Sequence, residues 1–129
     1  MRFLGDGVPV DEIESRLDFE ASSFGRKGDH LRNNPAFAQY HTNVWVSKYA
    51  ADSDVPFQEQ ISLILDRLES KVDALSEILS LPNVEGELFL GFSSANGQGG
   101  AVFSPGLLRR IANIGLSLSL DLYPLGTDR

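Results

Sequence analysis

The chain of 129 residues has the length of one ordinary domain, enough for a single hydrophobic core. Hydrophobic residues make up 42% and charged residues 22%, a balance typical of globular rather than disordered chains. The chain has no cysteine, which excludes disulfides, thiolate metal ligands and a cysteine nucleophile, and favours the cytoplasm. We expect no membrane span and no signal peptide, because apolar runs are short and charge interrupts the N-terminus.

The net charge is strongly negative. Eighteen acidic residues against eleven Lys and Arg give a formal charge of −7. Such a surface repels a phosphate backbone, so a nucleic acid is not an expected partner. Acidic balance also aids the solubility of many cytoplasmic proteins, so it has an ordinary explanation. The alternative is that it complements a basic protein partner and accelerates association with it.

The first third of the chain predicts a strand, a helix and a long loop. Residues 1–4 indicate a short strand that ends in a glycine-rich turn. Pro9 and the acidic residues after it favour a helix over residues 9–17, because proline and carboxylates suit a first helical turn. Residues 18–39 show no sustained period and predict a loop with room for one short strand. A loop this long in a small domain is often functional.

The middle of the chain predicts one strand and one long helix. Alternation over residues 40–49 indicates a strand that places His41 and Trp45 on the same face. Residues 52–56 predict a turn. Apolar residues at steps of three and four then predict one continuous helix over residues 57–79.

A hairpin is expected after this helix. Alternating apolar residues predict a strand over residues 84–92, a turn over 93–97 and a returning strand over 98–103. The glycines from Gly97 to Gly100 are also compatible with a phosphate-binding loop. No helix follows them directly and no Lys-Ser or Lys-Thr pair is present, so a hairpin turn is the favoured interpretation.

The last helix and strand have the clearest signals. Ser104 is a favoured N-cap, Pro105 a favoured first helical residue and Gly115 a favoured helix stop. Leucines then alternate with polar residues over 116–122, which predicts a strand with one buried face.

Together these elements predict one α+β domain over residues 1–129. Its fold is expected to be a small, mostly antiparallel sheet with helices packed on one face, a ferredoxin-like sandwich. An open sheet edge in so small a domain favours a homodimer through strand pairing. The predicted core contains Ile61, Leu65, Leu68, Val72, Leu88, Leu90, Phe92, Leu116, Leu118 and Leu120.

Four residues are candidate ligand-binding residues. Arg26 and Lys27 lie between glycines in the basic stretch of the long loop and are able to bind a carboxylate or phosphate. The alternative is that they pair with the surplus carboxylates of the chain itself, which is more usual for charged runs. His41 and Trp45 suit stacking and hydrogen bonding to a ligand. For Trp45 the alternative is a place in the core, which the large area of an indole favours.

No catalytic residue, metal ligand or cofactor is predicted. The two histidines, His30 and His41, lack the His-x-x-x-His spacing of a metal site, and no Gly-x-Ser-x-Gly elbow is present. The carboxylates Asp11 and Glu12 are explained by the start of the predicted helix. We therefore expect a protein that is not an enzyme.

Several segments together resemble a bacterial family known as domain of unknown function 4279. They are GDGVPVDEIESRL, RKGD from Arg26 to Asp29, Trp45, the long helix, and GQGG followed by FSPGLLRRIANIGLSLSLDLYPLG. The resemblance implies a single small α+β domain in a bacterial cytoplasm and supplies no catalytic residues. Some such small families lie beside toxin genes, which makes an immunity role an expectation. Only four residues precede Gly5, which indicates either a short first strand or a start codon placed late.

Two functions follow from these observations. The first is a non-catalytic binding protein that engages another protein, with an immunity-type inhibitor of a toxin as one such role. The alternative is a small-molecule or anion sensor built on Arg26, Lys27, His41 and Trp45.

Overall fold

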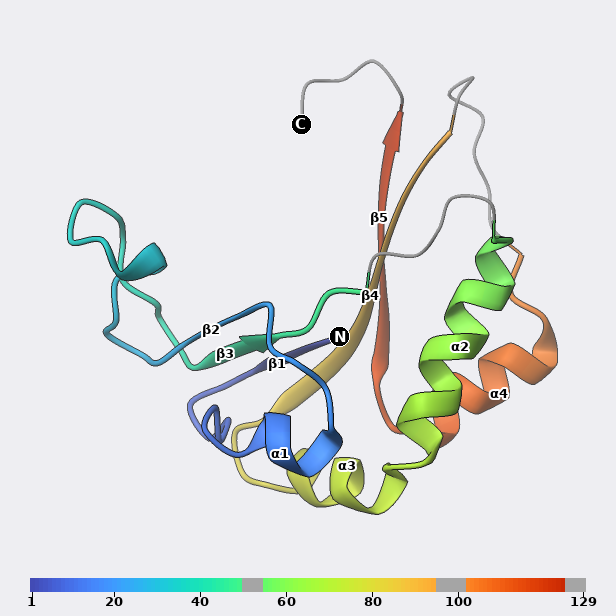
Figure 1. Cartoon of the computed structure of the whole chain (residues 1–129), viewed down its shortest axis with the longest axis horizontal. Coiled ribbons are helices and arrows are strands. Elements are labelled where there is room, and N and C mark those ends of the chain that lie inside the picture. The colour runs from blue at the N-terminus through green and yellow to red at the C-terminus, as the bar shows by residue number, and fades with distance from the viewer. Residues whose placement is uncertain (50–54, 95–101, 125–129) are drawn as a thin grey trace.

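A five-stranded sheet organises the part of the chain that the structure describes (Figure 1). The computed structural model describes residues 1–49, 55–94 and 102–124, of which residues 92–94 and 121–124 are described by their backbone alone. The strand order is β2-β3-β1-β4-β5. The strands are β1 (Arg2–Leu4), β2 (Ser23–Gly25), β3 (Val44–Val46), β4 (Glu85–Ser94) and β5 (Ser117–Pro124).

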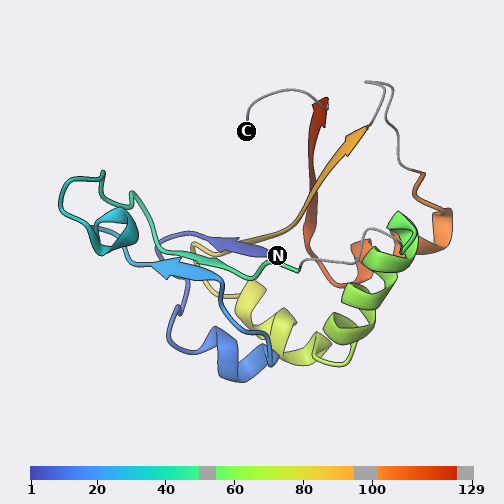
Figure 2. The same cartoon turned by 45° about the horizontal axis from the view of Figure 1, so that its top comes forward.

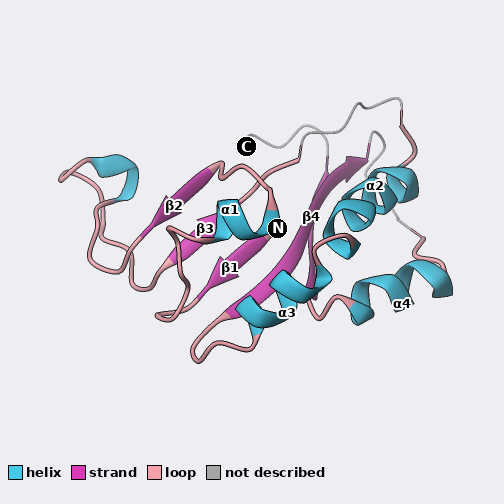
Figure 3. Cartoon of the chain, turned by 60° about the horizontal axis from the view of Figure 1, so that its bottom comes forward, coloured by secondary structure: helices cyan, strands magenta, loops and turns pink. Residues whose placement is uncertain are grey.

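The helices all cover one face of this sheet (Figure 3). They are α1 (Ile13–Leu17), α2 (Phe57–Glu69), α3 (Val72–Leu79) and α4 (Pro105–Asn113), besides a single 3₁₀ turn, η1 (Leu31–Asn33). Neighbouring strands run antiparallel except β4 and β5, which are parallel and are joined through α4. The predicted α+β class with a mostly antiparallel sheet is therefore confirmed.

The ferredoxin-like topology is not confirmed. That arrangement contains a split βαβ unit, in which another strand lies between two parallel strands. Among the described elements, β4, α4 and β5 follow one another, and the two parallel strands are neighbours at one end of the sheet.

The core lies between the sheet and the helices. Phe3 and Trp45 lie side by side on the sheet with ring centroids 5.9 Å apart, and both are fully buried. Each α-helix contributes an apolar face to this layer, as amphipathic packing requires. The other buried apolar side chains of the described residues are Val8, Val10, Ile13, Leu17, Phe19, Ile61, Leu65, Leu68, Leu75, Ile78, Leu88, Leu90, Leu107, Ile111, Ile114 and Leu116.

For two residues the prediction that they lie in the core is wrong. Val72 is 41% exposed, and Leu120 is 48% exposed. Leu120 lies on β5, an outer strand of the sheet, and this strand as a whole rises away from α4 (Figure 2). Leu118 is partly buried, whereas the side chain of Phe92 lies outside the described part of the chain.

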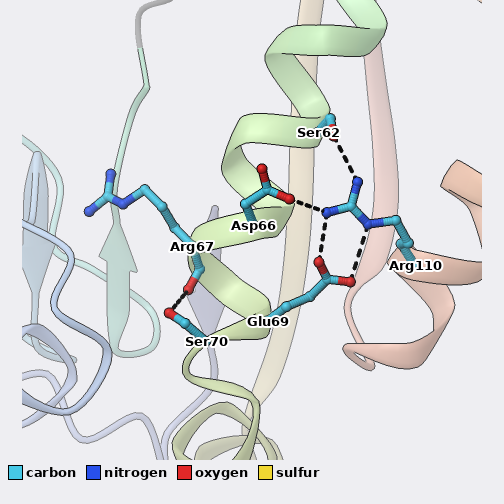
Figure 4. A network of polar contacts seen from close by, with 6 residues as sticks. All are labelled: Ser62, Asp66, Arg67, Glu69, Ser70 and Arg110. Atoms are coloured by element: carbon cyan, nitrogen blue, oxygen red, sulfur yellow. Dashed lines mark hydrogen bonds and ion pairs between the residues drawn. The ribbon is translucent and has the colours of Figure 1, made fainter.

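The helix predicted to be continuous over residues 57–79 is broken in two. The break also explains why the side chain of Val72 is exposed. The Ser70 hydroxyl donates to the Arg67 carbonyl oxygen over 2.6 Å (Figure 4). The Lys71 N–H donates to the Leu68 carbonyl oxygen over 3.0 Å. Both bonds reach back three residues, one fewer than in a regular α-helix, and tighten the last turn of α2. At Lys71 the backbone leaves the helical region, with φ −121° and ψ 24°. The chain then changes direction, and α3 packs beside α1.

Two further elements are shorter than predicted. The first helix begins only at Ile13, because Val8 and Val10 each enter the core and the chain between them and Ile13 runs in turns. The strand predicted over residues 40–49 is formed only by Val44–Val46. Residues 26–43 instead continue the loop that leaves β2.

The predicted hairpin after residue 92 lies mostly outside the described residues. The glycines from Gly97 to Gly100 lie outside the described residues. Residues 52–54 of the other predicted turn, over residues 52–56, also lie outside them. Val102 and Phe103 form no strand, and β4 pairs with β1 and β5.

The predicted ends of the last helix are confirmed. Ser104 is the N-cap, and its hydroxyl accepts a hydrogen bond from the Leu107 N–H over 3.2 Å. Pro105 is the first residue of α4. Gly115 follows the helix with φ +80°, a left-handed conformation that glycine adopts without strain.

Arg110 joins α4 to α2 (Figure 4). Its guanidinium binds Asp66 over 2.6 Å and Glu69 over 2.6 Å, and it donates to the Ser62 hydroxyl over 2.7 Å. The hydrogen bond from Arg110 holds the pKa of Glu69 below its ordinary 4.5. The pairing with Glu69 is therefore complete above that pH and is lost as the pH falls through the lowered pKa.

Replacing Arg110 with methionine is expected to lower the free energy of unfolding by about 1 kcal/mol, because exposed ion pairs contribute about 0.2–1 kcal/mol each and two such pairs converge on Arg110. Urea unfolding at low and high salt measures the loss, which is expected to shrink at high salt. Arg109→Met is the control, since Arg109 is exposed and forms no ion pair with a described residue. Equal losses in the two variants would contradict this role for Arg110.

Candidate functional site

Residues 26–43, termed the arm, join β2 to β3 and project from the end of the sheet (Figure 1). The arm is held together by its own backbone. Tyr40 accepts a hydrogen bond from Gly28 over 3.0 Å and donates to Asp29 over 2.8 Å, and Leu31 donates to Ala38 over 2.9 Å. These bonds make the arm a structured projection of the β2–β3 hairpin.

The base of the arm is tied to the body of the domain by ion pairs. Arg26 pairs with Asp11, and the Lys27 ammonium lies 3.3 Å from an Asp6 carboxylate oxygen. Asp6 also accepts a hydrogen bond of 2.7 Å from the Thr42 hydroxyl. The bonds from Thr42 and Lys27 lower the pKa of Asp6 below its ordinary value. Arg26 and Lys27 thus contact carboxylates of the chain itself, as in the alternative interpretation of the basic stretch.

His41 and Trp45 do not share a face. Trp45 is 0% exposed and packs on Phe3, which is the core position that the size of its indole favours. His41 is exposed and precedes β3, because the strand begins only at Val44. The four sequence-predicted binding residues therefore lie in two places, the base of the arm and the core. The indole Nε1–H is buried and has no hydrogen-bond partner among the described residues.

The tip of the arm carries apolar side chains that sequence reasoning missed. Leu31 is 38% exposed and Phe37 is 43% exposed, and the Arg32 guanidinium lies 5.5 Å from the Phe37 ring centroid. His30 Nδ1 lies 2.8 Å from the Phe37 carbonyl oxygen, a distance at which it donates a hydrogen bond and fixes the backbone there. The signal available in the sequence was a leucine and a phenylalanine in a loop whose other residues are mostly polar.

The backbone of the tip is strained. Arg32 and Asn33 have φ of 56° and 54°, in the left-handed region that residues with a Cβ rarely adopt. Asparagine tolerates this conformation, whereas arginine has no such advantage. The Asn34 side chain supports the turn by accepting a hydrogen bond from Ala36 over 3.0 Å. Strain of this kind persists where the surrounding structure imposes it, often at binding sites.

Within residues 1–49, 55–94 and 102–124, no three His, Asp or Glu residues are placed to hold a metal ion. None of the helices described is long and apolar enough to cross a membrane.

The fold and the arm define a small α+β protein whose helices cover one face of a mixed sheet and whose β2–β3 connection projects from it. The chain belongs to the family described as domain of unknown function (DUF4279), which its residues 1–125 match. No curated protein and no solved structure matches it.

Proposed function

We propose that the chain is a non-catalytic protein-binding domain that engages its partner through the tip of the arm. The observation that carries this proposal is the exposure of Phe37 and Leu31 on a projection that is already hydrogen-bonded. An ordered loop loses less conformational entropy on binding than a flexible one. An aromatic side chain stacked with an arginine is also typical of the residues that dominate interface energies.

The charges of the chain indicate the chemistry of the partner. Residues 30–49 contain no Asp or Glu, so a carboxylate on the partner is the natural counterpart of Arg32 at the tip. The chain as a whole carries a net charge of −7, which accelerates association with a partner of net positive charge. The partner proposed is therefore a basic protein with an apolar pocket for Phe37.

Within this class, the specific role proposed is that of a cytoplasmic immunity-type inhibitor of a toxin. Such an inhibitor acts by covering a surface and needs no catalytic group. The absence of cysteine supports a reducing compartment. An anion sensor at Arg26 and Lys27 receives no such support, because both side chains already contact Asp11 and Asp6.

The Leu31→Ala/Phe37→Ala variant is expected to lose partner binding by about thirtyfold or more, because hot-spot truncations cost at least about 2 kcal/mol. Native mass spectrometry on tagged protein from its host lysate at low salt identifies the companion and shows whether the chain itself is a homodimer. Affinities for that companion are then compared between variants. Raising the salt is expected to slow association.

The matched control is Leu108→Ala, since Leu108 is similarly exposed but lies on α4. We expect it to retain the partner, and both variants to unfold within about 0.5 kcal/mol of the original chain. A companion that binds the arm variant as tightly as the original chain would overturn the proposal.

A further inference from the structure

A groove of about 730 Å³ lies where β1 ends and β4 continues beyond it. Arg2 of β1 pairs with Glu87, so β4 from Phe89 to Ser94 has no residue of β1 opposite it. Both faces of β4 border the groove at this step, together with α2 and the end of β3. Its volume is in the range of small-molecule sites.

The walls of the groove are mainly apolar. Phe19, Ile61 and Leu88 contribute buried surface, while Tyr49 and Phe89 are exposed at its border. Serine and glutamine side chains supply a few polar groups among them. This combination of an apolar wall and few polar groups is typical of sites for organic ligands.

The charged groups of the groove are all cationic. Arg2, Lys48 and Arg67 line it, and none of its described lining residues is Asp or Glu, although the chain has eighteen of them. Arg2 is neutralised by its ion pair with Glu87. Lys48 forms no ion pair with a described residue, so no carboxylate in the described part of the chain compensates its charge at the groove.

Arg67 likewise forms no ion pair with any carboxylate that the structure describes. It stacks over Phe19 with its guanidinium carbon 4.1 Å from the ring centroid, and donates only to the neutral Asp18 carbonyl oxygen over 3.0 Å. Figure 4 shows that Arg67 leaves α2 on the side opposite to Asp66 and Glu69, the carboxylates that bind Arg110. Asp66 and Glu69 lie one residue before and two residues after Arg67 on α2. Both are directed toward Arg110 of α4 and do not line the groove.

We infer that this groove binds a small apolar molecule that carries a carboxylate. The apolar body lies against Phe19, Ile61 and Leu88, and the carboxylate is bound by Lys48 and Arg67. A planar guanidinium held by an aromatic ring is already oriented for such a group, and the apolar surroundings strengthen the contact. The site is separate from the arm and does not depend on the function proposed for it.

Calorimetric titration of the full chain with octanoate tests the inference. Octanoate is expected to bind saturably and to raise the melting temperature, whereas 1-octanol, which lacks the charge, is expected to bind about tenfold more weakly or less. Acetate, which lacks the apolar body, is expected not to bind measurably. Lys48→Met and Arg67→Met are each expected to weaken octanoate binding about tenfold.

Arg109→Met is the control, because it removes the same charge from an exposed position outside the groove. Lys48 is exposed, so its replacement leaves the fold intact even where that of Arg67 does not. Equal affinities for octanoate and octanol, or an equal loss in Arg109→Met, would overturn the inference. Asp52 and Asp54 follow Lys48 closely in the sequence and lie outside the described residues. Octanoate binding that appears only in the Asp52→Ala/Asp54→Ala variant would also overturn the inference, because these carboxylates would then be what Lys48 and Arg67 bind.

Discussion

Replacing Trp45 with alanine is expected to lower the free energy of unfolding by about 3–5 kcal/mol. The indole is fully buried between sheet and helices and contacts Phe3, so its removal leaves a cavity at the centre of the core. Small domains have only about 5–15 kcal/mol of stability in total. The variant is therefore expected to unfold at much lower urea concentrations, as followed by far-UV circular dichroism.

The matched variant is Trp45→Phe, which keeps an aromatic ring and removes the indole N–H that has no described hydrogen-bond partner. A buried N–H without a partner is itself destabilising, so its removal offsets part of the lost packing. We expect a loss of about 1 kcal/mol or less. Equal losses for alanine and phenylalanine would show that the ring volume at this position is unimportant and would contradict the prediction.

Replacing Gly5 with alanine is the second large effect expected, a loss of about 3–5 kcal/mol in the free energy of unfolding. Gly5 has φ +132°, and a Cβ added there would lie 1.9 Å from the Asn83 carbonyl oxygen. The obstacle is backbone and cannot rotate away. The Gly5 N–H also bonds to the Asn43 carbonyl oxygen over 3.1 Å, so a displaced Gly5 would disturb the base of the arm as well.

Gly106→Ala is its control, because Gly106 lies in α4 with no atom within 4 Å of the added Cβ and no left-handed φ. Alanine favours a helix over glycine by up to about 1 kcal/mol, so a small rise in melting temperature is expected. Thermal unfolding of the two variants decides the matter. A Gly5→Ala variant that melts with the original chain would contradict the close approach of Gly5 and Asn83.

Local signals in the sequence predicted the local structure well. Ser104, Pro105 and Gly115 act on the few residues around them, and the helix they define is α4. The break between α2 and α3 was not predictable in the same way, because the apolar period continues through Ser70 and Lys71. The direction of α3 depends on its packing beside α1. The period of apolar residues gives no information about such a contact between distant segments.

The candidate sites depend on contacts between distant segments, and the sequence predicted them less well. The alternative of pairing within the chain anticipated the contacts of Arg26 and Lys27, but not that Asp11 and Asp6 are the partners. Lys48 and Arg67 lie on separate elements and only the fold brings them to one groove. The inferred role of Arg67 depends on Asp66 and Glu69 pointing toward Arg110 and away from the groove. The spacing of residues in the sequence does not reveal this orientation.

The arm has a consequence for how this domain diversifies. The backbone hydrogen bonds of residues 28–40 described above all close within the arm, whose attachment to the body depends on Arg26, Lys27, Thr42 and Asn43. Side chains at the tip are thus free to change without altering the packing of Trp45 and its neighbours. Under the proposed function, exchange of Leu31, Arg32 or Phe37 would change the specificity of the tip while the scaffold stays the same, with no compensating substitution needed in the core.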